Sequence, residues 1–162
     1  MNSELFLAGL WLGLVQTGLS YALLCGAGAA PLLVFALFGA WIFGGTLGAL
    51  MNGRAERSAL AAAGAAAAAA AALLWLRPFF PGAWLFALGA AVFCGVFGGI
   101  LIVSRARRGG NVGKTLLMEN NGFTIGLVLG LAALYADPAL LAGAAVLLWM
   151  GLLINFGRKQ SG

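Results

Sequence analysis

Glu119 is the side chain in this sequence best placed to carry chemistry. It falls about one turn inside an apolar run, and a carboxylate inside a membrane helix is costly and usually paired. A functional carboxylate at this position would act as a proton or cation relay, or as a gate contact. The alternative is an interfacial carboxylate that pairs with Arg57, Arg105 or Lys114 at the same membrane edge.

A second group of polar side chains lies in the middle and outer part of the first apolar run, and it consists of Gln16, Thr17, Ser20 and Tyr21. These side chains could line a polar path or touch a lipid-soluble ligand such as a quinone. The alternative is hydrogen bonding between helices, with each bond contributing well under about 2 kcal/mol. Asn120 and Asn121, which follow Glu119, can bridge neighbouring helices in the same way.

Other reactive groups are scarce. The sequence contains no histidine, which is a usual ligand of haem and catalytic zinc and the commonest general base. Cys25 and Cys94 both lie in apolar runs, with neither a CxxC spacing nor a metal-like spacing, and we interpret them as small buried hydrophobic residues. We therefore expect no haem, no zinc and no enzymatic activity. Any other cofactor stays unknown.

The composition indicates the class of protein. Hydrophobic residues make up 63% of the chain and charged residues only 8%, with long uncharged runs between the charges. A helix needs about 20 apolar residues to cross roughly 30 Å of hydrocarbon. The sequence therefore predicts an all-α, polytopic membrane protein with a single transmembrane domain over residues 1–162. Six spans are predicted, at residues 5–25, 31–51, 58–76, 83–103, 115–136 and 138–156.

Small residues recur at every fourth position in several of these runs. Residues four apart lie on one side of a helix, and small side chains there let a second helix backbone come close. The residues predicted to pack helices in this way are Gly9, Gly13, Ala40, Gly44, Gly48, Gly95, Gly99, Gly122, Gly126 and Gly130.

The basic residues predict the orientation. Apart from Arg77 they fall in the turns after the second and fourth runs and in the C-terminal tail; the turn residues are Arg54, Arg57, Arg105, Arg107, Arg108 and Lys114. Because cytoplasmic loops are enriched in Lys and Arg, both termini are predicted to be cytoplasmic, in a bacterial inner membrane. The net charge of +5 reflects this topology, so nucleic acid is not an expected partner. The turn from Arg105 to Lys114 could also bind anionic lipid or an acidic soluble protein.

Six spans with basic turns after the second and fourth resemble one half of a major facilitator superfamily transporter. The turn GALMNGRAER, at residues 48–57, resembles that superfamily's signature between its second and third helices, although Asn52 stands where the signature has an acidic residue. The proline of the superfamily's antiporter motif is missing from the fifth run. In such a half, the first and fourth helices face the central cavity.

A closer likeness is to the membrane module of bacterial spermidine-synthase-like proteins. The phrase at residues 35–54, with paired glycines before a Gly-Arg turn, is similar to one in those modules. Their fifth helix also begins with an acidic residue followed by a glycine ladder, as Glu119 precedes the glycines at 122, 126 and 130. The sequence has no GxGxxG-type loop and no soluble domain, so the aminopropyltransferase activity of that family is not implied.

From these observations we expect a non-enzymatic integral membrane subunit that anchors or completes a larger membrane complex, which could be a redox or electron-transfer assembly. The alternative is a small transporter that works as a homodimer of six-helix halves. The expected partners are membrane lipids, other membrane subunits or a second copy, and a soluble protein at the cytoplasmic face.

Overall fold

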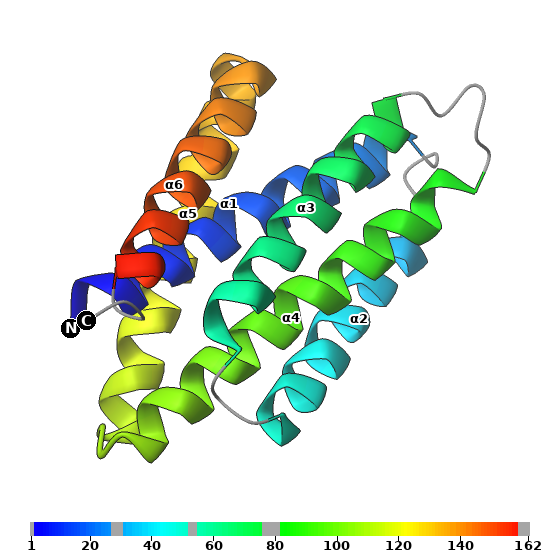
Figure 1. The fold of residues 1–162 in the computed structure, drawn as a ribbon. Coiled ribbons are helices and arrows are strands. Elements are labelled where there is room, and N and C mark those ends of the chain that lie inside the picture. The colour runs from blue at the N-terminus through cyan, green and yellow to red at the C-terminus, as the bar shows by residue number, and fades with distance from the viewer. Residues whose placement is uncertain (1, 27–30, 52–54, 76–81, 159–162) are drawn as a thin grey trace.

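The computed structural model describes residues 2–26, 31–51, 55–75 and 82–158, and these residues form a bundle of six α-helices (Figure 1). The helices are α1 (Asn2–Gly26), α2 (Pro31–Leu50), α3 (Glu56–Trp75), α4 (Ala83–Arg107), α5 (Val112–Ala136) and α6 (Pro138–Arg158). The prediction of an all-α fold is confirmed, and each predicted span corresponds to one helix.

Five of the helices are long and apolar enough to cross a membrane, namely α1, α2, α4, α5 and α6. The described part of α3 is not among them. It begins with Glu56 and Arg57 and continues mostly as alanine, which is less apolar than leucine or phenylalanine. The apolar helices therefore indicate a membrane protein, whereas the count of six spans stays a prediction.

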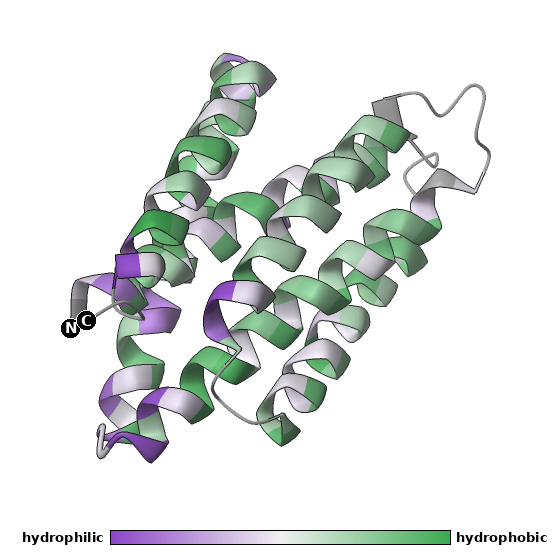
Figure 2. Ribbon diagram, in the orientation of Figure 1, coloured by the Kyte–Doolittle hydropathy of each residue, from purple (hydrophilic) through white to green (hydrophobic). Residues whose placement is uncertain are grey.

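The bundle has one end where charge gathers (Figure 2). Helices α1, α3 and α5 begin at this end, and α2, α4 and α6 finish there. Every Lys and Arg in the described ranges lies toward this end, which we call the charged end. At the opposite end, the described part of the chain has one charged residue, Asp137. Its Oδ1 accepts a hydrogen bond of 2.8 Å from the N–H of Ala139 and so begins α6, as Asp before Pro138 predicts.

Two close helix crossings join outer helices to the interior of the bundle. In the first, α2 packs on α4, and a Cβ atom added to Gly44 or Gly48 would overlap the backbone carbonyls of Val92 and Val96. In the return direction, Gly95 and Gly99 of α4 lie against the backbone of α2 around Trp41 and Gly45. Contact of this kind brings Cα–H groups to carbonyl oxygens and requires that no side chain stand between the helices.

In the second crossing, α1 packs on α5 in the same manner. The backbone at Gly9 and Gly13 meets the carbonyls of Glu119 and Phe123, while Gly130 lies against the side chain of Thr17. Gly122 and Gly126 complete the contact from α5 by meeting the backbone of α1. The nine glycines predicted to pack helices all lie at these two crossings. The tenth predicted packing residue, Ala40, is half-buried and packs against the core.

The side chains of three helices meet in the interior. Trp11 of α1 and Phe97 of α4 stack edge to face with ring centroids 5.9 Å apart. Phe156 of α6 meets Phe97 in the same way at 6.4 Å. Such aromatic contacts add to the energy of burial. They fix the last turns of α6 against α1 and α4 near the charged end.

Candidate functional site

A cluster of ionised side chains lies inside the charged end, where α1, α3 and α4 meet. Nη2 of Arg105 lies 2.9 Å from Oε2 of Glu4 and 3.8 Å from Oε2 of Glu56. Nη2 of Arg108 lies 3.1 Å from Oε1 of Glu56, and the hydroxyl of Ser104 donates to the same carboxylate. We call these five residues the charge cluster.

Both carboxylates and one of the two guanidinium groups of the charge cluster are buried. Glu4, Glu56 and Arg105 are 5%, 4% and 6% exposed. The two carboxylates and two guanidinium groups balance one another, which offsets part of the desolvation cost of burying ions. Within the described part of the chain, Nε of Arg105 has no hydrogen-bond partner. The arrangement holds three helix ends in a fixed relation, since each ion would be costly to leave alone in the interior.

Sequence reasoning missed part of this cluster. Arg105 was predicted as a residue of a basic turn, whereas its side chain points into the bundle. Glu4 and Glu56 were not predicted as its partners. A signal was present, because the sequence has only four acidic residues and two of them stand at helix starts on the same predicted side as Arg105.

The remaining residues of the predicted basic turns lie near the surface. Arg107, Arg108 and Lys114 are exposed. Arg57 is also exposed, and its guanidinium lies beside the backbone of Gly157 in α6. Arg54, together with Asn52 of the proposed signature, lies outside the described residues.

Glu119 stands apart from the charge cluster. Its side chain is half-buried on α5, about two turns from the start of the helix. None of the ion pairs found among the described residues involves Glu119, and Arg105, one of its expected partners, pairs with Glu4 and Glu56 instead. Asn120 and Asn121 are exposed on the surface of the bundle.

The polar residues of the first span do not form one site. Gln16 is 1% exposed, and within the described ranges neither atom of its amide has a hydrogen-bond partner. The hydroxyl of Thr17 donates to the carbonyl of Gly13 in its own helix at 3.0 Å. Ser20 is half-buried, and Tyr21 is exposed and lines a cavity. The side chains therefore turn to different surroundings, and Thr17 packs α1 against α5.

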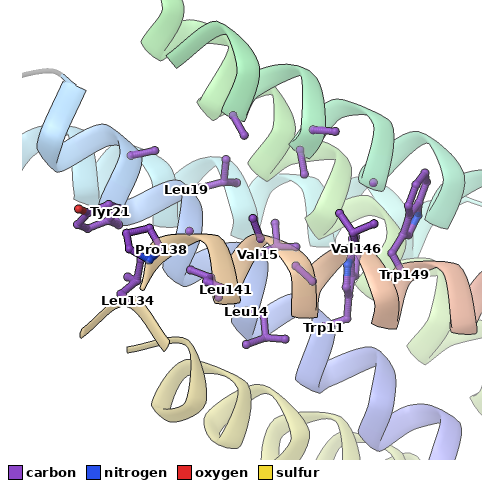
Figure 3. Close-up of a pocket in the computed structure, with 18 residues that line it drawn as sticks. Trp11, Leu14, Val15, Leu19, Tyr21, Leu134, Pro138, Leu141, Val146 and Trp149 are labelled. Carbon is purple, nitrogen blue, oxygen red and sulfur yellow. The ribbon is translucent and has the colours of Figure 1, made fainter. Parts of the chain in front are cut away.

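The cavity beside Tyr21 has a volume of about 400 Å³ and lies between α1, α3 and α6 (Figure 3). Its walls are almost wholly apolar, and the α3 wall is built from Gly64, Ala67, Ala68 and Ala71. The indole of Trp149 lies against Gly64 and donates a hydrogen bond of 3.0 Å to the carbonyl of Leu60. Sequence reasoning did not find this cavity, because an alanine run shows only that side chains are small.

The two ends of the cavity differ. Figure 3 shows Tyr21, Pro138 and Leu134 at one end and Trp11 with Trp149 at the other. Pro138 is the first residue of α6, and Tyr21 is near the end of α1, so this end of the cavity lies near the helix termini opposite the charged end. Trp11 and Trp149 stand near the middle of their helices. The cavity thus runs from one end of the bundle toward its centre.

No three His, Cys, Asp or Glu side chains come together as a metal site within the described ranges. Comparison with known proteins finds no matching family model, no similar curated protein and no similar solved structure.

Proposed function

We propose that this chain is a non-enzymatic integral membrane subunit that anchors or completes a larger membrane complex, such as a redox or electron-transfer assembly. The observation that carries the proposal is the separation of charge from cavity. The buried ions are paired with one another at the charged end, while the cavity is walled by apolar groups. Such an interior favours a fixed scaffold over a path for a polar substrate.

The outer surface supports the same function. Helix α2 exposes a row of large apolar side chains along its length, including Phe35, Ile42, Phe43 and Leu50. Helix α6 exposes Leu147 in the same way. These faces suit lipid or the helices of other membrane subunits, and the exposed Lys and Arg of the charged end suit anionic lipid or an acidic soluble partner.

We also propose that the bundle is similar to one half of a major facilitator. Each such half is built from two inverted three-helix repeats. A repeat of this kind would map α1 onto α4, α2 onto α5 and α3 onto α6, and it would map the α1·α5 crossing onto the α4·α2 crossing. The glycine contacts agree with this mapping, and α1 and α4 are the two most buried of the five apolar spans. They also run in opposite directions through the bundle.

This mapping favours one alternative function. In a facilitator half, the first and fourth helices face the central cavity between two halves, so a homodimer of this chain would be a small transporter. In this alternative, Glu119 and Gln16 are the groups to test as a relay. In both cases we place the charged end in the cytoplasm of a bacterial inner membrane, because that end carries the Lys and Arg.

Purification from the native membrane tests the choice. A tagged full-length chain is extracted in a mild detergent, and the mass and composition of what copurifies are determined. We expect other membrane proteins at fixed stoichiometry. A stable pair of identical chains with nothing else attached contradicts the subunit and supports the transporter.

A charge-neutral variant sharpens the same experiment. Glu119→Gln is expected to leave copurification of the partners unchanged, because no described ion pair depends on Glu119. If the variant stays folded but has lost a proton-coupled uptake that the unmodified protein shows in reconstituted vesicles, the protein is a transporter and the subunit proposal is wrong.

A further inference from the structure

The cavity between α1, α3 and α6 has the length of one membrane leaflet. Trp11 and Tyr21 mark its two ends on α1. Ten residues of helix rise by about 15 Å, at roughly 1.5 Å per residue. The hydrocarbon core of a bilayer is about 30 Å thick, so one leaflet is roughly 15 Å deep. A single hydrocarbon chain that starts near Tyr21 would therefore end near Trp11.

The volume of the cavity fits a chain and is too small for a helix. If a methylene group fills about as much space as a water molecule, roughly 30 Å³, the 400 Å³ cavity holds about a dozen of them. A helix with side chains is about 10 Å wide, and a piece of the same length occupies roughly 1,000 Å³. A helix of a partner, or of a second copy, would lie across the cavity and leave it unfilled.

The lining groups match hydrocarbon along the whole cavity. Three lining side chains carry a polar group: Tyr21 at the outer end, and Trp11 and Trp149 at the inner end. The indole N–H of Trp149 already donates to the carbonyl of Leu60, and Trp11 is only 1% exposed, so the inner end presents little polar surface to a quinone ring or any other polar head. Tyrosine near a helix end is typical of the level of the lipid headgroups. A polar head belongs at this outer end.

We propose that this cavity binds one acyl chain of a membrane phospholipid. The headgroup lies near Tyr21, and the terminal methyl group lies between Trp11 and Trp149. An unfilled cavity of this size would deprive its walls of dispersion contacts, and a chain restores them. The acyl chains of phospholipids surround every membrane protein. One of them can therefore enter the cavity directly from the bilayer.

Native mass spectrometry of the intact protein, released from mild detergent, tests the site. Ala68→Phe fills the cavity from α3, and Ala69→Phe adds the same ring to an exposed neighbour that does not line it. We expect one phospholipid retained per chain in the unmodified protein and in Ala69→Phe, and its loss in Ala68→Phe. Equal retention in both variants places the lipid elsewhere and overturns the proposal.

Other occupants give distinct masses. A retained isoprenoid lipid in place of a phospholipid overturns the choice of an acyl chain. A dimer mass that disappears in Ala68→Phe and persists in Ala69→Phe shows that a second copy covers the cavity. Recovery of partner proteins with both variants is measured separately, so that failure of the lipid site and failure of the proposed subunit function are distinguished.

Fluorescence quenching provides a second measurement that does not depend on Ala68→Phe. Trp11 is shielded from the bulk lipid and lines the cavity, so a bromine inside the cavity comes closer to it than one outside. A variant that keeps Trp11 as its single tryptophan is placed in vesicles of phosphatidylcholine brominated near the methyl end or near the carboxyl end of the acyl chains. We expect several-fold stronger quenching by the methyl-end bromines. Absence of quenching by either lipid overturns the proposal.

Discussion

Two helix pairs that the proposed repeat makes equivalent are packed very differently. Helix α3 lies along α4 over most of its length, whereas its counterpart α6 makes far fewer contacts with α1. Toward the end opposite the charged end, α6 runs away from α3 and α4 (Figure 1). The cavity lies in the space that this difference leaves. We call the α3·α4 pair closed and the α6·α1 pair open. A shared helix arrangement therefore does not determine how closely two equivalent helices pack.

Side-chain size explains the closed pair. Ala63 of α3 and Ala90 and Ala91 of α4 are almost completely buried. The thiol of Cys94 reaches the carbonyl of Ala63 at 4.0 Å, which requires a small residue on the facing helix. At the charged end, Glu56 joins α3 to α4 through Ser104 and Arg108. Small side chains let the two backbones approach, and the charge cluster fixes their register.

Larger side chains explain the open pair. Where α6 nears α1, a methyl group of Leu141 fills the space beside Gly18, at 3.6 Å from the position of a Cβ atom there. Further along α6, the indole of Trp149 rests on Gly64 of α3. Leu141 thus acts as a spacer between α6 and α1, and Trp149 as a spacer between α6 and α3, while the glycines on the other side of α1 pack against α5.

The largest expected effect comes from the ions that close the first pair. Arg105→Ala removes the buried cation that lies 2.9 Å from Glu4 and 3.8 Å from Glu56, and breaking a buried ion pair destabilises a protein by about 3–5 kcal/mol. The measurement is the free energy of SDS-induced unfolding in mixed micelles. Arg108→Ala, at the residue that follows the last turn of α4, is the control; its side chain is largely exposed, and we expect less than about 1 kcal/mol. If both variants lower the free energy of unfolding equally, the buried ion pairs contribute no more to stability than the exposed one.

A size change tests the closed and open pairs directly. Ala63→Leu places extra methyl groups between α3 and α4, and overpacking of this kind costs up to about 3 kcal/mol. Ala142→Leu makes the same change on α6, where the side chain faces the cavity, and we expect little or no loss. The comparison uses the same unfolding assay. If Ala142→Leu is as damaging as Ala63→Leu, the second pair is not open.

Substitutions in the two glycine crossings are expected to lower the free energy of unfolding by a smaller amount. Gly95→Ala on α4 and Gly126→Ala on α5 each put a Cβ atom into a facing backbone carbonyl, and we expect a similar cost of about 2 kcal/mol for both. Gly89→Ala is the control on α4, because a Cβ atom at that position meets no atom within 4 Å. The free energy of unfolding is measured for all three variants. If Gly95→Ala and Gly126→Ala differ from each other by much more than Gly89→Ala differs from the unmodified protein, the two crossings are not equivalent.

The smallest expected effect concerns the spacer. Trp149→Phe keeps an aromatic ring on Gly64 but removes the hydrogen bond to Leu60, and interhelical hydrogen bonds in membranes average about 0.6 kcal/mol. The unfolding free energy should fall by that amount, with the six-helix fold retained by circular dichroism. A loss several times larger would mean that the part of the indole missing from Phe, and not the hydrogen bond alone, holds α6 in place.

Much of the fold could be predicted because it depends on local patterns. The lengths of the apolar runs predict the helices, and Asp137 before Pro138 predicts the start of α6. The four-residue glycine spacing predicts which face of each helix packs, although not which helix it meets. The partners of Gly44 and Gly122 became known only from the crossings themselves, since many apolar helices offer an equally suitable surface.

The candidate sites could be predicted only in part. Glu119 and Gln16 stand out in the sequence because a polar group in an apolar run is conspicuous, yet the described structure brings neither of them into the charge cluster. Glu4 and Glu56 look like ordinary first-turn residues, and they meet Arg105 across 101 and 49 positions of the chain. No short-range pattern encodes such a meeting.

Local sequence patterns are enough to predict that this protein is helical and apolar, which ends of its helices carry charge and which faces are small enough to pack. These properties follow from side chains acting on their own helix and its surroundings. The arrangement of the helices adds that Arg105 is buried with Glu4 and Glu56 at the charged end and that α6 stands off α1 to leave a cavity. Both depend on how far apart helices come to rest, and that distance is set jointly by side chains such as Trp149 and Gly64 that are remote in sequence.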